Sequence, residues 1–129
     1  MRQKEARRLS GNEHLFIQHK GKEILYTDYT NLTHDTFLDV IKKAHQLILT
    51  SGKKDILQVV DLTNSFGDDK VMDELKRTAK ESKAYIKKRA IVGVVGIKKV
   101  LLGVVNNFSN EKIVPFKTVE EAKDWLAQD

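Results

Sequence analysis

The feature that most constrains this chain is a short, almost wholly apolar run that ends in a polar turn. Residues 56–60 read Ile-Leu-Gln-Val-Val, and the tetrad Asp61-Leu62-Thr63-Asn64 follows directly. A near copy, Asp28-Tyr29-Thr30-Asn31, stands 33 residues earlier, at the end of another strand-like run. A short β-branched run that is apolar on nearly both faces is typical of an interior strand covered on two sides. The repeated tetrad therefore predicts two places where a strand gives way to a helix.

Two alternating segments precede and include the first tetrad. Residues 13–20 and 23–29 each alternate apolar with polar side chains, and Gly21-Lys22 lies between them. Alternation on both sides of a short glycine-containing link is the pattern of a β-hairpin with one wetter face. We therefore expect the folded part of the chain to begin with a hairpin.

Helical spacing of apolar residues follows each tetrad. Thr33 is a candidate N-cap for a first helix, which we expect to end before Gly52, because glycine suits the left-handed position after a helix. A second helix is expected to open at Asp68 and to run to about Lys88, with Ile86 on its buried stripe.

The last third of the chain repeats this alternation of strand and helix. Strands are expected over residues 90–95 and 113–116, and Pro115 favours an edge position for the second of them. Helices are expected over residues 97–108 and after Thr118, which stands in capping-box spacing with a glutamate.

The resulting order β-β-α-β-α-β-α-β-α predicts an α/β fold. We expect a mostly parallel five-stranded sheet built by right-handed crossovers, with an N-terminal antiparallel hairpin and helices packed on it. Residues 1–11 read as a basic, flexible lead-in. No linker divides the rest, so residues 12–129 are expected to form a single domain.

Composition narrows the class of protein. The chain has no cysteine, which excludes disulfides, thiolate zinc sites and cysteine nucleophiles and fits a reducing compartment. Lys98 and Lys99 interrupt the most apolar stretch, residues 90–105, so that no uninterrupted run could span a membrane. The N-terminus lacks the apolar segment of a secretory signal. We expect a cytoplasmic protein.

The net charge of +5 is unevenly distributed. Basic residues gather in the first eight positions and on both sides of the strand expected at residues 90–95. Because no aromatic side chains alternate with these lysines, the base-stacking surface of a nucleic-acid binder is missing. We interpret the basic residues as solvated ends and expect no nucleic-acid partner.

The strand ends carry the best candidates for a functional site. In an open α/β sheet, ligands bind beyond the carboxyl ends of the strands, and Asp28 and Asp61 are expected at two neighbouring ends. Such a group could bind a cation or a polar small molecule. The alternative is turn chemistry, because Asp and Asn side chains stabilise turns through nearby backbone amides. The candidate binding surface comprises Asp28, Asn31, Asp61, Thr63, Asn64, Ser65, Asp68 and Asp69.

A second candidate is an anion site at the start of the helix expected over residues 97–108. Gly96, Ile97 and Lys98 could supply donors there, and lysines in a first helical turn oppose the helix dipole unless an anion is bound. The glycines could equally serve turn geometry. We expect no metal or cofactor, because the four histidines show no ligand spacing and are interpreted as surface or hairpin residues. No motif supports enzyme chemistry.

Four segments together carry a family resemblance. In chain order they read GKEILYTDYTNLT, DILQVVDLTNS, KKRAIVGVVGIKKVLLGVVNNF and IVPFKTVEEAKDWL. They resemble the SpoIIAA-like family of small STAS-type proteins, which are related in fold to anti-sigma-factor antagonists and to the C-terminal lobe of Sec14/CRAL-TRIO domains. The resemblance covers about residues 13–127. It implies a sheet with sequential strand order and a regulatory or ligand-binding role rather than catalysis.

The resemblance also points to a phosphorylation switch that this chain lacks in its usual form. In the antagonists, a serine near the start of the helix after the third strand is phosphorylated, usually within Asp-Ser-(Ser/Thr)-Gly. Here residues 65–69 read Ser-Phe-Gly-Asp-Asp. Asp68 and Asp69 would repel a phosphate at this helix start. Phosphorylation of Ser65 or Thr63 is left open.

Three functions follow, in order of preference. The first is a non-enzymatic regulatory or protein-interaction module that uses the turn and helix start over residues 61–69. The second is a binding protein for a lipid-like or anionic small molecule. The third is an enzyme using Asp28 and Asp61, which would need perturbed pKa values in a shared cleft. A homodimer is also plausible, since Leu102 and the proline-bearing last strand leave apolar surface near one edge.

Overall fold

The computed structural model describes residues 14–65, 67–93 and 112–128. Its elements are β1 (His14–His19), β2 (Lys22–Asp28), α2 (His34–Thr50), β3 (Ile56–Asp61), α3 (Asp69–Ser82), the short 3₁₀ helix η1 (Lys83–Tyr85), β4 (Ile86–Val92), β5 (Lys112–Phe116) and α5 (Val119–Ala127). The helix expected over residues 97–108 and the basic lead-in lie outside the described residues.

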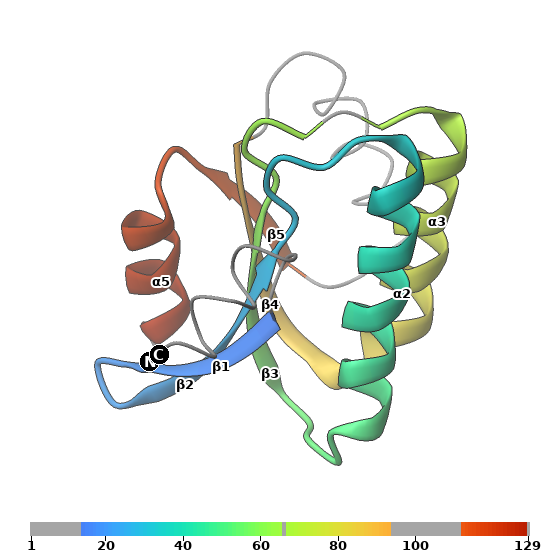
Figure 1. Cartoon of the computed structure of the whole chain (residues 1–129). Helices are drawn as coiled ribbons and strands as arrows, with labels where there is room; N and C mark the ends of the chain where they lie inside the picture. The colour runs from blue at the N-terminus through green and yellow to red at the C-terminus, as the bar shows by residue number, and fades with distance from the viewer. Residues whose placement is uncertain (1–13, 66, 94–111, 129) are drawn as a thin grey trace, which may run out of the picture.

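The five strands form one sheet in the order β1-β2-β3-β4-β5. β1 pairs antiparallel with β2, and each of the other neighbours pairs in parallel. Figure 1 shows this sheet with α2 and α3 on one face and α5 on the other. The predicted α/β class, the hairpin and the sequential strand order are confirmed, and β5 with its Pro115 is an edge strand as expected.

Helices on both faces explain why the central strands are apolar on both sides. On the α2 and α3 face, Phe37 and Ile41 pack with Val71 against side chains of β3 and β4. On the opposite face, Ala122 and Leu126 of α5 pack on side chains of the central strands. Burial on two faces leaves little room for polar side chains within the strands, so those that occur there stand out.

Helix ends follow the capping residues expected from the sequence. The Thr118 hydroxyl accepts a hydrogen bond from the Glu121 amide at 3.1 Å, and Gly52 follows α2 with a φ of +72°. Thr33 holds the N-cap position of α2, but its side chain makes no capping bond. The Thr36 hydroxyl donates instead to the Thr33 carbonyl at 2.8 Å.

Two boundaries differ from the sequence expectation. The hairpin turn is Lys20-Gly21, both with positive φ, and Lys22 already pairs with His19. Two left-handed residues suit a tight hairpin turn, which explains the shift by one position. The helix expected to reach Lys88 ends at Ser82 instead, and after η1 the strand β4 begins at Ile86.

Among the described residues, no helix is both long and apolar enough to cross a membrane. The expected homodimer and the extent of the domain stay predictions. Leu102, which belongs to the apolar surface expected for the dimer, lies outside the described residues.

Replacing Leu126 with alanine should lower the free energy of unfolding by about 2–5 kcal/mol, because Leu126 is 1% exposed and joins α5 to the sheet. The control is Leu49→Ala, the same change at a side chain that is 38% exposed, which should cost less than about 0.5 kcal/mol. Chemical denaturation measures both. Equal losses for the two variants would contradict the packing described for α5.

Candidate functional site

The carboxyl ends of β2 and β3 lie side by side. The parallel register places Asp28 opposite Asp61. It continues without a bulge from the pair Ile24–Leu57 to this pair. The two tetrads therefore leave the sheet at the same level. The expectation that the two aspartates occupy neighbouring strand ends is confirmed.

The two tetrads fold into the same turn. In the first, the Asp28 Oδ1 accepts hydrogen bonds from the backbone N and the hydroxyl of Thr30, at 2.9 and 2.6 Å. In the second, the Asp61 Oδ1 accepts from the backbone N and the hydroxyl of Thr63, at 3.1 and 2.6 Å. These are Asx-type turns, in which a carboxylate replaces a backbone acceptor.

Each turn ends on an asparagine in the left-handed conformation, Asn31 with φ of 59° and Asn64 with φ of 60°. Asparagine tolerates this region better than most residues. The turns also continue the pairing of the strands, because the Tyr29 amide donates to the Asp61 carbonyl at 2.9 Å and the Asn31 amide donates to the Thr63 carbonyl at 3.0 Å. The repeat in the sequence is thus a repeat in backbone geometry.

Ser65 joins the two turns. Its hydroxyl accepts a hydrogen bond from the Leu32 amide at 2.8 Å and donates to the carbonyl of Tyr29. The residue is 0% exposed. A hydroxyl in this position is not accessible to a kinase in this conformation, and its two bonds satisfy backbone groups that would otherwise be buried without a partner.

β4 supports the second turn from its other side. The Leu62 amide donates to the Val92 carbonyl at 2.8 Å. The next residue, Gly93, has a φ of +83°, and a Cβ there would lie 2.7 Å from the Thr63 nitrogen. Glycine at this place lets the end of β4 approach the turn closely.

The Asp61 carboxylate is almost fully buried and its two oxygens have different tasks. Oδ1 holds the turn, and Oδ2 accepts a hydrogen bond from the Tyr26 hydroxyl at 3.0 Å. Burial and the nearby Asp61 carboxylate raise the pKa of Tyr26 above its usual range, so the phenol remains a donor. Both strand-end aspartates are engaged in fixing structure. Among the described residues, no group of acids and histidines could hold a metal ion.

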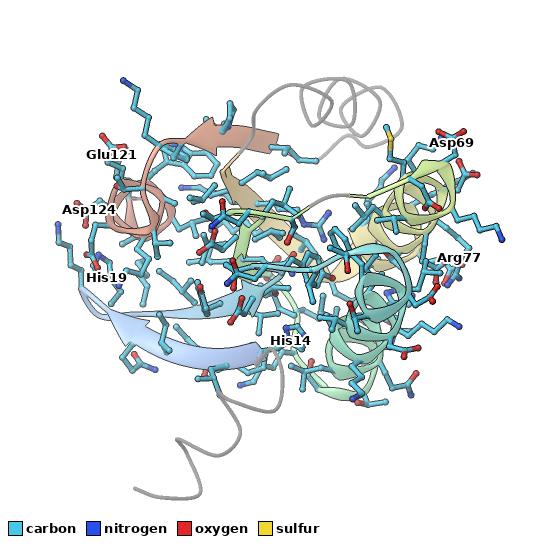
Figure 2. All side chains as sticks on the ribbon, turned by 45° about the horizontal axis from the view of Figure 1, so that its top comes forward. His14, His19, Asp69, Arg77, Glu121 and Asp124 are labelled. Atoms are coloured by element: carbon cyan, nitrogen blue, oxygen red, sulfur yellow. The ribbon has the colours of Figure 1, made fainter. Side chains whose placement is uncertain are left out.

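The start of α3 lies directly after the second turn. The Asp68 side chain accepts a hydrogen bond from the Val71 amide at 3.1 Å and caps the helix. Asp69 is exposed at the start of α3, where Figure 2 labels it. Thr63, Asn64 and Asn31 are exposed as well.

The structure thus brings six of the predicted site residues into the two turns and places the other two at the adjoining helix start. We use the name polar edge for the solvent-facing part of this surface: Asn31, Thr63, Asn64, Asp68 and Asp69. The possible anion site at Gly96, Ile97 and Lys98 lies outside the described residues.

Sequence reasoning missed a buried polar chain across the sheet. The Arg89 Nε donates to the Gln58 Oε1 at 2.7 Å, and the Gln58 Nε2 donates to the Thr27 hydroxyl at 2.8 Å. A second Arg89 nitrogen donates to the Ser82 hydroxyl at 3.2 Å. The available signal was Gln58 inside the otherwise apolar run of β3, whereas Thr27 and Arg89 stand in strands that carry other polar residues as well.

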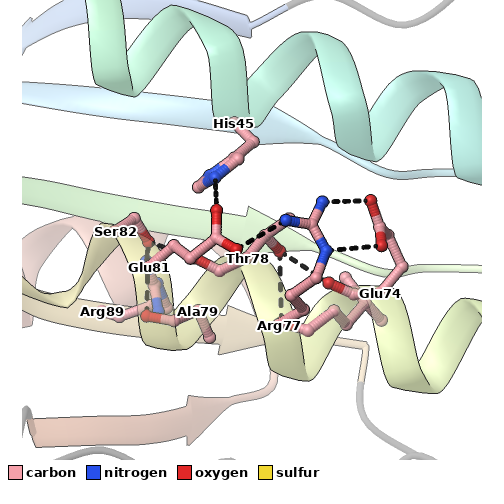
Figure 3. A network of polar contacts seen from close by, with 9 residues as sticks. His45, Glu74, Arg77, Thr78, Ala79, Glu81, Ser82 and Arg89 are labelled. Carbon is pink, nitrogen blue, oxygen red and sulfur yellow. Dashed lines mark hydrogen bonds and ion pairs between the residues drawn. The ribbon is translucent and has the colours of Figure 1, made fainter.

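His45 was also misjudged, because it is buried rather than on the surface. Figure 3 shows its Nε2 beside the Glu81 carboxylate, at 3.0 Å, and Arg77 bound to Glu81 at 2.6 Å and to Glu74 at 2.7 Å. The hydrogen bond from His45 is the largest cause that lowers the pKa of the Glu81 carboxyl, and the hydrogen bond from Arg77 is the second. This network ties α2 to α3.

Comparison with solved structures finds a crystal structure of an uncharacterised protein of the DUF3478 family with a SpoIIAA-like fold, from Shewanella loihica PV-4. The two chains superpose with a TM-score of 0.68 and 18% sequence identity, over 91% of this chain and 94% of the other. No family model matches this chain, and no curated protein matches its sequence. The likeness shows the fold.

Gly93→Ala should destabilise the protein more than Gly52→Ala does. Both residues have positive φ, but a Cβ at Gly52 would meet nothing within 4 Å. Gly52→Ala should therefore cost only the backbone term, about 1–2 kcal/mol, and Gly93→Ala should cost about 1–3 kcal/mol more because the turn must move. Thermal or chemical denaturation tests this. A Gly93 variant no worse than its Gly52 control would argue against close approach at the turn.

Ser65→Ala should lower stability by about 1–3 kcal/mol, because it leaves the Leu32 amide and the Tyr29 carbonyl without their buried partner. Ser51→Ala is the control, since Ser51 is half-buried and water can replace its hydroxyl. It should lose about 0.5 kcal/mol or less. Chemical denaturation of both variants measures the difference in stability. If both variants behave alike, Ser65 does not join the turns as described.

Proposed function

We propose that this chain, whose fold is SpoIIAA-like, is a non-enzymatic protein-interaction module of STAS type. The polar edge is its recognition surface. The observation that carries the proposal is the hydrogen-bonded double turn at the carboxyl ends of β2 and β3, where open α/β sheets usually place their ligand sites.

The polar edge has the qualities of a preformed binding surface. Its backbone is held by the Asx turns, by the left-handed asparagines and by the buried Ser65 hydroxyl. Binding of a partner would therefore cost this protein little conformational entropy at the polar edge. Exposed Asn31 and Asn64 offer amide donors and acceptors from one level of the sheet.

The charge of the polar edge suggests the chemistry of the partner. Asp68 is the N-cap of α3, Asp69 lies in its first turn, and Asp73 is exposed one turn later. A partner with basic and hydrogen-bonding side chains fits such a surface, and opposite charges would speed the encounter. The net charge of the whole chain is +5, so this acidic helix start is a local feature.

The module would act without phosphorylation of Ser65. That hydroxyl is buried between the turns, and a phosphate there would face the acidic start of α3. Asp28 and Asp61 would serve as structural residues of the recognition surface, since each carboxylate binds the threonine of its own turn. We therefore assign neither of them a catalytic role.

The test removes the charge of the polar edge while keeping its structure. The double variant Asp68→Asn, Asp69→Asn retains an N-cap, because asparagine caps helices about as well as aspartate. Recovery of partner protein by cross-linking and affinity capture from cells of the source organism should fall at least about tenfold. This corresponds to a loss of about 1.4 kcal/mol or more of binding free energy.

The matched control is Glu23→Gln, Asp55→Asn. It removes the same charge from exposed residues at the opposite end of the sheet, and asparagine suits the positive φ of Asp55. Partner recovery with the control should equal that of the unchanged protein. Equal recovery from both double variants would overturn the assignment of the polar edge.

A further inference from the structure

A groove of about 370 Å³ lies at the amino ends of β2, β3 and β4. These strands are parallel, so the groove and the polar edge lie at opposite ends of the sheet. Figure 1 shows the link from α2 to β3, which forms part of the groove, at the bottom of the molecule. We call it the lysine groove, after Lys53, Lys54 and Lys87 in its wall. It is large enough for a small molecule, since such sites usually have volumes of about 300–1,000 Å³.

One wall of the lysine groove is an ion pair held against an aromatic ring. The Lys53 Nζ lies 3.0 Å from the Glu23 Oε1 and 4.9 Å from the centre of the Phe16 ring. The carboxylate and the cation–π contact both hold this ammonium group in place. Because the charges of Lys53 and Glu23 balance each other, this wall adds little net attraction for an anion.

The positive charge available to a ligand comes from Lys54 and Lys87. Both side chains are exposed, and neither forms an ion pair with another residue that the structure describes. Lys22 lines the groove as well, but it is engaged in an interaction of its own, so its charge is not counted as available. Apart from Glu23, the groove has one carboxylate, that of the exposed Asp55. Two unpaired ammonium groups therefore face one unpaired carboxylate.

The backbone is irregular where these charged side chains lie. The residues on either side of Lys87 pair with consecutive residues of β3, Ile56 and Leu57, so Lys87 itself is left over as a bulge. A bulge changes the direction of its side chain and recurs beside functional sites. Asp55, directly before β3, has a left-handed backbone with a φ of 55°. Two irregular positions thus supply opposite charges to the same groove.

We propose that the lysine groove binds a small phosphorylated sugar or polyol. Lys54 and Lys87 donate hydrogen bonds to the phosphate, for which the ammonium group is a suitable point charge. The Asp55 carboxylate accepts hydrogen bonds from hydroxyl groups of the same ligand. A molecule with one phosphate and several hydroxyls therefore uses both kinds of charge in the groove.

The two carboxylates separate this class of ligand from other anions. A molecule with anionic groups throughout would be repelled by Asp55 and Glu23, whereas hydroxyl groups are donors to them. Inorganic phosphate would use the lysines alone. Binding here does not require the protein partner proposed for the polar edge, and either assignment can fail without the other.

The probe is glucose 6-phosphate, added to ¹⁵N-labelled full-length protein at constant ionic strength. We expect saturable shifts of the backbone amides of Lys54, Asp55 and Lys87. Glucose lacks the phosphate and inorganic phosphate lacks the hydroxyls of the sugar, so each should bind at least about tenfold more weakly. Shifts that do not saturate, or equally tight binding of glucose or inorganic phosphate, would overturn the proposal.

The double variant Lys54→Gln, Lys87→Gln locates the phosphate. Both side chains are exposed, so the fold should be kept, and the affinity for glucose 6-phosphate should fall at least about tenfold. The matched control is Lys42→Gln, Lys43→Gln, which removes the same charge from exposed residues of α2 and should leave the affinity unchanged. Equal losses in both double variants would show an effect of net charge alone and would refute the site.

Asp55→Asn tests the choice of a sugar phosphate. Asparagine suits the positive φ of this residue, so the backbone of the groove should be kept. Loss of the charged acceptor should weaken glucose 6-phosphate binding about fivefold, whereas inorganic phosphate should bind as before or more tightly. Unchanged or tighter binding of glucose 6-phosphate would mean that Asp55 only repels anions, and would overturn the role of the hydroxyl groups.

Discussion

The in-register pairing of β2 with β3 is the constraint on which the rest of the structure depends. It places Asp28 opposite Asp61 and so allows two copies of one turn to lie together. The Ser65 hydroxyl can join the turns only because they leave the sheet at the same level. A slip of one residue would also turn the buried side chains of β3 to the wrong face. Fold and polar edge are therefore fixed by the same pairing.

Much of the fold could be predicted from the sequence because the signals were local. Alternation around Gly21, the cap at Thr118 and the apolar run of β3 each depend on residues close in the chain. The strand ends could be predicted as well, since parallel strands bring their carboxyl ends to one side of a sheet. The sequence alone is compatible both with ligand binding by these carboxylates and with a role in the turns. The hydrogen bonds to Thr30 and Thr63 show that they stabilise turns.

The features that could not be predicted depend on residues far apart in the sequence. Ile86 fits a helical stripe and a strand equally well, and only its packing with Leu25 and Ile56 assigns it to β4. His45 gave no sign that α3 would bring Glu81 to its ring. The hydrogen bonds of Arg89 to Gln58 and Ser82 join three elements. Such partners are set by tertiary packing, which single-chain periodicity does not record.

The position of α5 has a consequence for the order in which the protein can be completed during synthesis. Among the described elements, α2 and α3 cover one face of the sheet, and their residues precede β4 in the chain. Of the described helices, α5 covers the opposite face, with Ala122 and Leu126. Until residues 119–127 have left the ribosome, the apolar side chains of Ile24, Val59 and Ala90 lack this cover. A nascent chain therefore carries a one-sided sheet, the state in which a chaperone would be most useful.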